Sequence, residues 1–185
     1  SNLKLRSSAK GGDLICLTGM VGDSAGGLQA IFNDLPDNPN TKRLLQQHLT
    51  PVPHIHEGIW LSQFDAVHAM MDVSDGIASD LKHILKASKL KGTIKIENIP
   101  MSEALIGESK ANQWNPLELA VSGGEDYVLL LSVDHKDYDW LAEAFWEKFA
   151  KPLYSIGFLE HGEPQITYLK DNKEIKNLKA GYSHF

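Results

Sequence analysis

The stretch Met70-Met71-Asp72-Val73-Ser74-Asp75-Gly76-Ile77-Ala78-Ser79-Asp80-Leu81 decides the fold of this chain. The apolar run at 66–71 predicts a buried strand, and the apolar positions at 77, 81, 84 and 85 follow the spacing of a helix face. In open α/β sheets, ligands bind where strands end in turns that lead to helices. The stretch therefore predicts an α/β domain with a ligand-binding site at the sheet edge near 72–76.

Two carboxylates and a hydroxyl lie in this turn. Asp72 and Asp75 are three residues apart, with Ser74 between them. Capping of the helix by Ser74 or Asp75 accounts for one of the acids. It does not account for Asp72, because a carboxylate at the end of a buried strand costs free energy unless a cation meets it. The residues alone leave open a metal or phosphate site and a capped helix.

Composition and charge narrow the class of protein. The 185 residues suffice for one domain, or one large domain with an appendage, and 42% hydrophobic with 23% charged residues is typical of soluble globular proteins. The net charge of −6, without a basic cluster, argues against a nucleic-acid groove. An acidic protein that handles phosphates needs cations, and Mg²⁺ is the natural partner of clustered carboxylates.

The single cysteine, Cys16, excludes a disulfide framework and a zinc site, which fits the reducing cytoplasm. No apolar run has membrane-spanning length and no signal peptide is visible, so we expect a cytoplasmic protein without a membrane partner. The chain does not begin with Met. Residues 1–12 are interpreted as a segment that enters from a preceding N-terminal domain, and residues 13–185 as the C-terminal α/β domain.

A second chemically dense stretch is Val121-Ser122-Gly123-Gly124-Glu125-Asp126-Tyr127, which enters an apolar strand at 128–133. A tight turn with solvated carboxylates is the alternative to a functional site here. Because both acidic turns adjoin apolar strands, we expect Asp72 and Glu125 at one shared edge of the sheet.

The remaining pattern predicts a mixed β-sheet covered by helices. Gly92 is expected to close the helix that follows Gly76, and Gly26 and Gly27 are expected to allow close helix–strand packing. Strands are predicted near 13–18, 67–72, 93–97, 127–133, 154–159 and 165–169, and helices near 24–32, 42–49, 57–64, 77–88, 102–110 and 137–148.

Five segments resemble, in order along the chain, motifs of the thiamine-monophosphate kinase family. Asp72–Leu81 is similar to D-[IV]-S-D-G-L-x-x-D-L, and Ser122–Tyr127 to S-G-G-E-D-Y. The others are Arg6–Asp13 (R-S-G-A-K-x-G-D), Thr18–Leu28 (T-G-x-x-G-D-S-A-A-G-L) and Gly181–Phe185 (G-aromatic-x-H-F). Singly, only the first two are specific. Together the five span nearly the whole chain and form a specific set.

The resemblance implies the C-terminal domain of a two-domain kinase in the aminoimidazole ribonucleotide synthetase-like superfamily. Such a kinase transfers the γ-phosphoryl group of ATP to thiamine monophosphate and forms thiamine diphosphate. The resemblance also assigns ligand contacts to six residues. They are Asp72 and Asp75 for Mg²⁺, Arg6 and Ser74 for ATP, and Glu125 and Tyr182 for the thiamine substrate.

One assignment is left open, and two positions depart from the family's motifs. Asp126 is the alternative to Glu125 as the substrate contact. His54 stands where the family usually has arginine, and Val128 where it usually has glutamate, and neither is assigned a role.

Phosphoryl transfer between two phosphates needs alignment and charge neutralisation, and no protein nucleophile is required or visible. No catalytic residue is therefore expected beyond the metal ligands. In the family, the other metal carboxylates and most of the dimer contacts belong to the N-terminal domain. We expect this chain alone to be inactive and a homodimer only of the full-length protein.

Two other functions compete with the kinase. One is another ATP-using synthetase or maturation factor of the same superfamily. The other is a non-catalytic binding domain that kept the fold, against which the intact Arg6, Asp72, Ser74 and Asp75 weigh.

Overall fold

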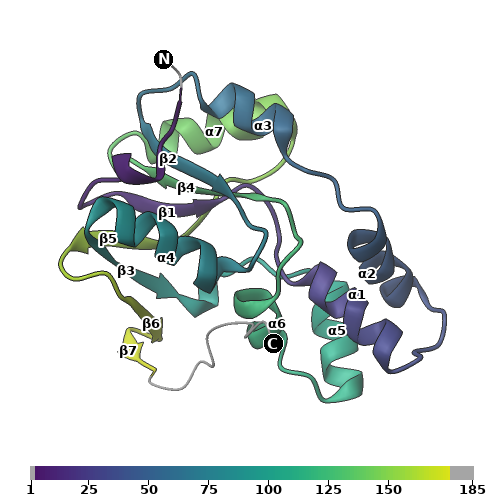
Figure 1. Cartoon of the computed structure of the whole chain (residues 1–185). Coiled ribbons are helices and arrows are strands. Elements are labelled where there is room, and N and C mark those ends of the chain that lie inside the picture. Colours follow the sequence, from purple (N-terminus) through teal and green to yellow (C-terminus); the bar gives the residue numbers. More distant parts are fainter. Residues whose placement is uncertain (1–2, 176–185) are drawn as a thin grey trace.

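The computed structural model describes residues 3–175, which build a seven-stranded sheet (Figure 1). The strand order is β2-β4-β1-β5-β3-β6-β7, and neighbouring strands are antiparallel except β3 and β6, which are parallel. The predicted mixed sheet is therefore confirmed. The strands are β1 (Leu14–Leu17), β2 (Val67–Asp72), β3 (Leu90–Lys95), β4 (Leu129–Val133), β5 (Tyr154–His161), β6 (Ile166–Lys170) and β7 (Lys173–Glu174).

Helices cover both faces of the sheet (Figure 1). On one face α4 (Ile77–Ser88) buries the apolar stripe that its sequence predicts. On the other face, α3 (Ile55–Leu61) and α7 (Tyr138–Phe149) pack around Phe145. Because successive strand side chains point to opposite faces, Ile15 and Leu17 of β1 join the α4 core, whereas Cys16 joins the other. The sheet is thus buried on two sides.

A separate helical group lies beside the sheet (Figure 1). The helices α1 (Asp23–Phe32), α2 (Pro39–Leu49) and α5 (Glu103–Asn112) pack together around a small core of Leu44, Ala104 and Leu105. The short helix α6 (Pro116–Ser122) contacts both α1 and α4. This arrangement brings α1 and α2 next to the turns that follow β2 and α6.

Several predicted boundaries were wrong. Lys89, in the left-handed conformation (φ 56°), ends α4, so Gly92 does not close this helix but pairs within β3. The predicted strand at 93–97 ends at Lys95, because a 3₁₀ helix, η2 (Ile96–Asn98), follows. The helix predicted at 57–64 lies at Ile55–Leu61.

Two helical features at prolines were not predicted. Pro39 occupies the first turn of α2, whose Asn38 cap accepts the Asn40 and Thr41 N–H groups, so this helix begins before the predicted position 42. Pro116 likewise begins α6, which Asn115 caps. Proline is favoured at a helix start, because it has no N–H to leave unpaired there.

Gly26 and Gly27 allow close packing, as predicted, but against a helix instead of a strand. A side chain on Gly27 would place its Cβ 2.3 Å from the carbonyl oxygen of Leu44 in α2. Between residues 3 and 175, no helix is both long and apolar enough to cross a bilayer.

Candidate functional site

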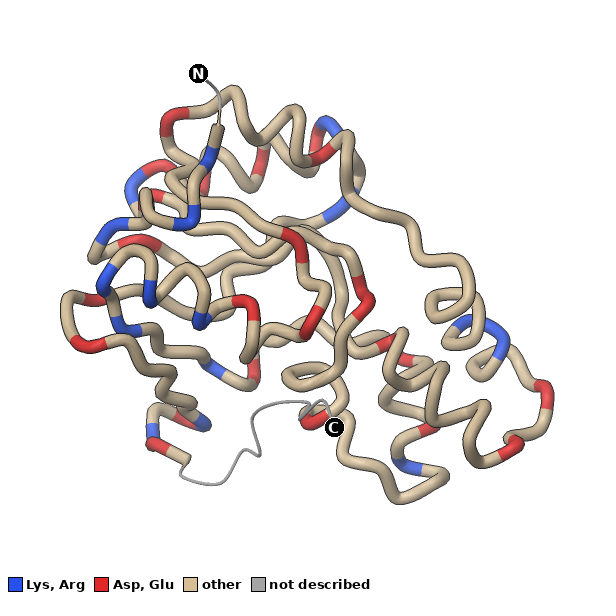
Figure 2. Tube along the Cα trace, viewed as in Figure 1, with Lys and Arg blue, Asp and Glu red and all other residues tan. Residues whose placement is uncertain are grey.

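The two acidic turns are joined by backbone hydrogen bonds that continue the β2–β4 pairing. The N–H of Val73 donates to the carbonyl of Val128 (2.8 Å), and that of Tyr127 donates to Val73 (3.0 Å). One step further, the N–H of Glu125 donates to the carbonyl of Ser74 (2.9 Å). Figure 2 shows acidic positions gathering where the chain leaves β2 and where it enters β4. The expectation of one shared edge is confirmed.

Two glycines allow this close approach. Gly76 has φ +94°, a conformation that side chains other than glycine rarely adopt, and a Cβ there would lie 2.7 Å from the carbonyl oxygen of Gly123. A Cβ on Gly124 would lie 2.3 Å from the carbonyl oxygen of Ser74. A side chain at either position would therefore push the turns apart.

A pocket of about 280 Å³ opens between these turns and the helices α1 and α2. It brings together three residues that the sequence predicted for ligands, namely Ser74, Asp75 and Glu125. Its apolar part is formed by Ala25 and Leu28. The pocket therefore combines two carboxylates with an apolar wall.

Asp80, from the first turn of α4, organises the turn after β2. Its carboxylate accepts the N–H groups of Ser74 and Asp75, both at 3.0 Å. The N-cap of α4 is Gly76, with no side-chain hydrogen bond, so of the two alternatives left open by the sequence, capping by Ser74 or Asp75 is not observed. Within residues 3–175, the carboxylates of Asp72 and Asp75 have no hydrogen-bond or ion-pair partner, which leaves both available to a cation.

The charge at this turn is concentrated. Burial raises the pKa of Asp80, the charges of Asp75 and Asp72 add to the rise, and the N–H donors from Asp75 and Ser74 oppose it. Three carboxylates are thus close enough to interact. A cation near Asp72 and Asp75 would relieve their mutual repulsion.

The two predicted Mg²⁺ ligands border different hollows. Asp75 lines the pocket described above, whereas Asp72 lines a groove of about 740 Å³ with Ile55 and Ile59 of α3. Carboxylate oxygens suit Mg²⁺, which usually completes its octahedron with phosphate oxygens and water. Among the described residues, no group of three His, Cys, Asp or Glu side chains is placed to hold a metal. Of the predicted Mg²⁺ ligands, the described residues therefore offer two carboxylates.

The neighbouring acids Glu125 and Asp126 point to different surroundings. Glu125 (φ 63°) lines the pocket. The Asp126 carboxylate instead accepts the N–H groups of Gly22 (2.7 Å) and Ser24 (3.3 Å) at the start of α1. Burial raises the pKa of Asp126 to about 7, the Gly22 and Ser24 donors lower it, and the charge of Asp23 adds to the rise. Asp126 thus holds the N-terminal end of α1.

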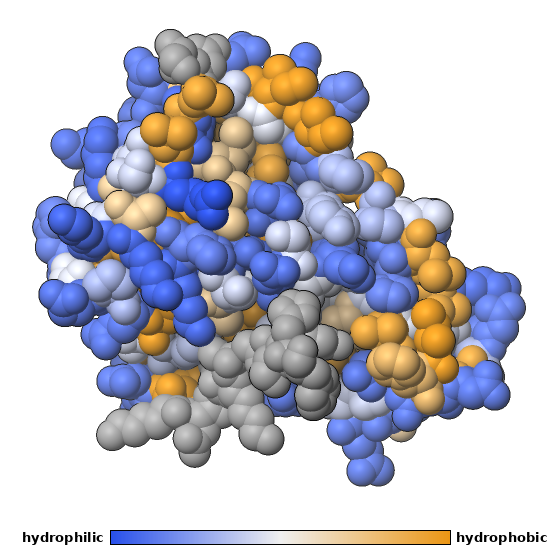
Figure 3. All heavy atoms as spheres, viewed as in Figure 1, coloured by the Kyte–Doolittle hydropathy of each residue, from blue (hydrophilic) through white to orange (hydrophobic). Residues whose placement is uncertain are grey.

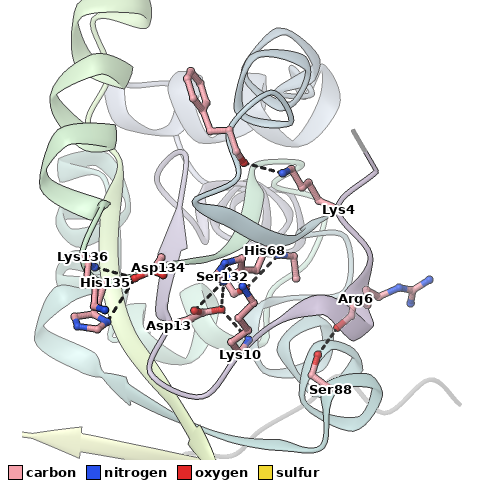
Figure 4. Close-up of polar contacts among 12 residues, drawn as sticks. Lys4, Arg6, Lys10, Asp13, His68, Ser88, Ser132, Asp134, His135 and Lys136 are labelled. Atoms are coloured by element: carbon pink, nitrogen blue, oxygen red, sulfur yellow. Dashed lines mark hydrogen bonds and ion pairs between the residues drawn. The ribbon is translucent and has the colours of Figure 1, made fainter. Parts of the chain in front are cut away.

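Arg6 is not brought together with the other predicted residues. It lies in η1 (Arg6–Ser8), where its carbonyl accepts a hydrogen bond from Ser88 (2.7 Å), and its side chain points away from that contact (Figure 4). Ser88 is the last of the 12 residues of α4, about 18 Å along the axis from the end next to Ser74. Tyr182 lies outside the described residues.

His54 has a structural contact. Thr18 Oγ1 accepts the N–H of Leu129 (2.9 Å) and lies within hydrogen-bond distance of His54 Nδ1, at 2.7 Å. Burial lowers the pKa of His54, the charge of Glu57 opposes this effect and that of Lys151 adds to it. The contact between the His54 ring and Thr18 ties the start of α3 to the residue that follows β1.

Three polar residues at or beside the pocket were missed as site residues. Ser24 and His48 line it from α1 and α2, and Asp80 supports its turn from α4. Asp80 belongs to the conspicuous stretch that begins at Asp72, so its position was a usable signal. Ser24 and His48 had none, because only the packing of two helices brings them to the turns.

Comparisons with known proteins agree with this architecture. The chain matches the family described as AIR synthase related protein, C-terminal domain, over residues 10–168. It is 37% identical over 186 residues to the thiamine-monophosphate kinase of Buchnera aphidicola subsp. Schizaphis graminum, covering 100% of this chain and 56% of that protein. The chain thus spans about half the length of the curated relatives that it matches.

Solved structures give the same result. Thiamine-monophosphate kinase from Stenotrophomonas maltophilia K279a aligns with a TM-score of 0.81 and 28% identity over 92% of this chain and 54% of that one. AaThiL, solved in complex with AMPPCP and TMP, aligns with a TM-score of 0.78 and 30% identity over 97% and 53%. Escherichia coli HypE, a hydrogenase maturation protein, shares only the fold, with a TM-score of 0.73 and 13% identity over 95% and 52%.

The resemblance to thiamine-monophosphate kinases that the motifs predicted is therefore confirmed over nearly the whole chain. The family match includes both acidic turns and six of the seven strands, at least in part. This chain belongs to the family described as AIR synthase related protein, C-terminal domain.

Proposed function

We propose that the full-length protein is an ATP-dependent kinase that phosphorylates thiamine monophosphate to thiamine diphosphate, with this chain as its C-terminal domain. The observation that carries the proposal is the joining of the two acidic turns, through which Ser74, Asp75 and Glu125 line one pocket. The similarity to thiamine-monophosphate kinases, and a neighbour solved with AMPPCP and TMP, support it.

In this proposal, Asp72 and Asp75 hold Mg²⁺ through their unpartnered carboxylates. Mg²⁺ bound there supplies positive charge to phosphate oxygens as charge shifts during transfer. Ser74 and Arg6 contact ATP, and Glu125 and Tyr182 contact the thiamine substrate.

The start of α4 favours a phosphate group at the pocket. This helix has no side-chain cap, and Ser79 of its first turn lines the pocket beside Ser74. Unpaired N–H groups and the positive end of the helix dipole attract anions. Ser74 donates its hydroxyl to a phosphate oxygen, and Asp80 keeps the turn rigid by accepting two N–H groups.

Residues 1–12 are proposed to enter from a preceding N-terminal domain that supplies the remaining metal carboxylates. Apolar side chains that are more than half exposed support a covering partner here, and Figure 3 shows apolar surface over α3 and the neighbouring N-terminal segment. They are Leu3, Leu5, Val52, Ile55 and Ile59. A homodimer of the full-length protein and a cytoplasmic location belong to the same proposal, the latter supported by the buried free thiol of Cys16.

A coupled kinase assay tests the function. The full-length protein is expected to convert thiamine monophosphate and Mg·ATP steadily to thiamine diphosphate, whereas residues 1–185 alone are expected to show no steady turnover. Titrations with nucleotide and with thiamine phosphates distinguish this kinase from a superfamily synthetase or maturation factor. ATP binding without any turnover of thiamine monophosphate by the full-length protein would refute the proposal.

A further inference from the structure

His48 lies between a buried hydroxyl and the pocket carboxylate. Its Nδ1 is 3.0 Å from Oγ of Ser24 and 3.6 Å from Oε2 of Glu125. The His48 side chain is 16% exposed and that of Glu125 57%. All three residues line the same pocket, from α1, α2 and the turn after α6.

Helix packing sets the place of the His48 ring. A Cβ on Gly27 of α1 would lie 2.3 Å from the Leu44 carbonyl oxygen and 2.7 Å from Cβ of His48. The absence of a side chain at Gly27 therefore lets α2 approach α1 closely enough for the ring to reach Ser24. The ring is held by this packing, whereas the Glu125 side chain is largely free.

The surroundings of Nδ1 indicate that it carries a proton. Both groups near this nitrogen are oxygens, and one is a carboxylate. A lone pair on Nδ1 would be repelled by the Glu125 carboxylate, whereas an N–H can donate to Ser24 and attract Glu125. Ser24 then accepts from the ring and keeps its own O–H to donate. Within residues 3–175, the Ser24 hydroxyl has no other hydrogen-bond partner.

We propose that His48 is a positioning residue that orients the Glu125 carboxylate for the organic part of the substrate. Its Nδ1–H attracts Oε2 of Glu125 and restricts a side chain that is otherwise free to rotate. Ordering such a side chain on binding weakens affinity, so a held carboxylate binds more tightly. This inference rests on the proposed role of Glu125 as the substrate contact.

Two variants of the full-length protein separate positioning from packing. In His48→Asn, the amide nitrogen takes a place close to that of Nδ1, whereas in His48→Gln it lies nearer to that of Nε2. We expect His48→Gln to raise the KM for thiamine monophosphate about fivefold to tenfold, with kcat and the KM for ATP within about twofold of wild type. His48→Asn is expected to keep all three constants within about twofold.

The result with Glu125→Gln completes the test. If His48 acts through Glu125, adding His48→Gln to Glu125→Gln leaves KM unchanged within about twofold. Wild-type KM in both His48 variants would overturn the proposal. So would an equal rise of KM in both variants accompanied by a lower melting temperature, because that pattern indicates lost packing alone.

A readout that does not depend on turnover keeps this inference distinct from the proposed function. The ¹⁵N chemical shifts of the His48 ring in the full-length protein report which nitrogen carries the proton. A proton on Nδ1 is expected, and an unprotonated Nδ1 would overturn the proposal. Absence of thiamine monophosphate turnover, with Nδ1 protonated, would refute the proposed function and leave the His48–Glu125 contact supported.

Discussion

The Lys10–Asp13–His68 cluster and the pair of acidic turns are both built from ionisable side chains. They differ in whether those side chains have partners within the protein. In the cluster, Nδ1 of His68 lies 2.9 Å from the Asp13 carboxylate and Nε2 lies 2.8 Å from Nζ of Lys10 (Figure 4). The Asp13 carboxylate also accepts the backbone N–H of Lys10 (2.8 Å). Every side chain of the cluster has a partner within the protein.

At the acidic turns, carboxylates lack strong partners within the described part of the protein. The carboxylates of Asp72 and Asp75 have no partner among residues 3–175, and Glu125 has only the contact with His48 at 3.6 Å. Their positions are nevertheless held by backbone hydrogen bonds and by Asp80. The difference teaches that a charge partnered inside the protein belongs to the fold, whereas a held but unpartnered charge is available to a ligand. The four predictions below test this distinction.

The largest expected effect is on turnover in Asp75→Asn of the full-length protein. Because Asp75 caps no helix, the melting temperature should not change. Loss of the negative charge should slow the reaction at least 100-fold, or about 3 kcal/mol of barrier, in coupled assays across a range of Mg²⁺ concentrations. Turnover close to that of wild type would place Asp75 outside the site.

The opposite result is expected in the Lys10–Asp13–His68 cluster. His68→Ala leaves the buried Asp13 carboxylate without its ring partner, so the free energy of unfolding should fall by about 2 kcal/mol in urea titrations, with kcat unchanged. His68→Asn, which can keep a donor near the position of Nδ1, serves as the control and should lose less. A fall in kcat with normal stability would assign the cluster to the active site instead.

Asp126 predicts a dependence of stability on pH. Its pKa is raised from 3.8 to about 7 in the folded protein, mainly by burial. Between these values the folded state binds more protons than the unfolded state, so the contribution of Asp126 to the free energy of unfolding falls as pH rises, by at most about 1.4 kcal/mol per pH unit. Below about pH 4 this contribution is fully present.

Urea titrations from pH 4 to pH 8 measure the contribution of Asp126 as the difference in the free energy of unfolding between wild type and Asp126→Asn. This variant keeps an oxygen that can accept the Gly22 N–H, so the comparison isolates the charge. Parallel stability curves for the two proteins would contradict a raised pKa of Asp126 in the folded protein.

The smallest effect is expected at Glu125, whose φ of 63° is strained for a residue with a Cβ. Glu125→Gly should be about 1 kcal/mol more stable than Glu125→Ala, because only glycine adopts this conformation without strain. Both variants lose the carboxylate, so both should bind thiamine monophosphate equally weakly. Equal stability of the two variants would show that this turn stores no strain.

Much of the fold could be predicted because its signals are local. The continuous apolar run of β1 and the helical spacing of Ile77, Leu81 and Leu85 depend on which faces are buried, and both faces of the sheet are covered. The errors fell where local signals conflict. Gly92 resembles a helix stop but lies in β3, and α6 is a short helix next to a turn rich in glycine.

The sequence by itself determined that two acidic turns adjoin apolar strands and that their side chains suit a phosphate and a cation. Only the tertiary structure decided which neighbouring acid faces the pocket. Glu125 and Tyr127 both adopt positive φ, and these backbone angles turn Asp126 towards α1 while Glu125 stays in the pocket. Tertiary packing also brought His48 to Glu125, because the approach of α2 to α1 depends on the space at Gly27. Contacts between residues far apart in the chain leave no periodic pattern in it, so they emerge only when the helices pack.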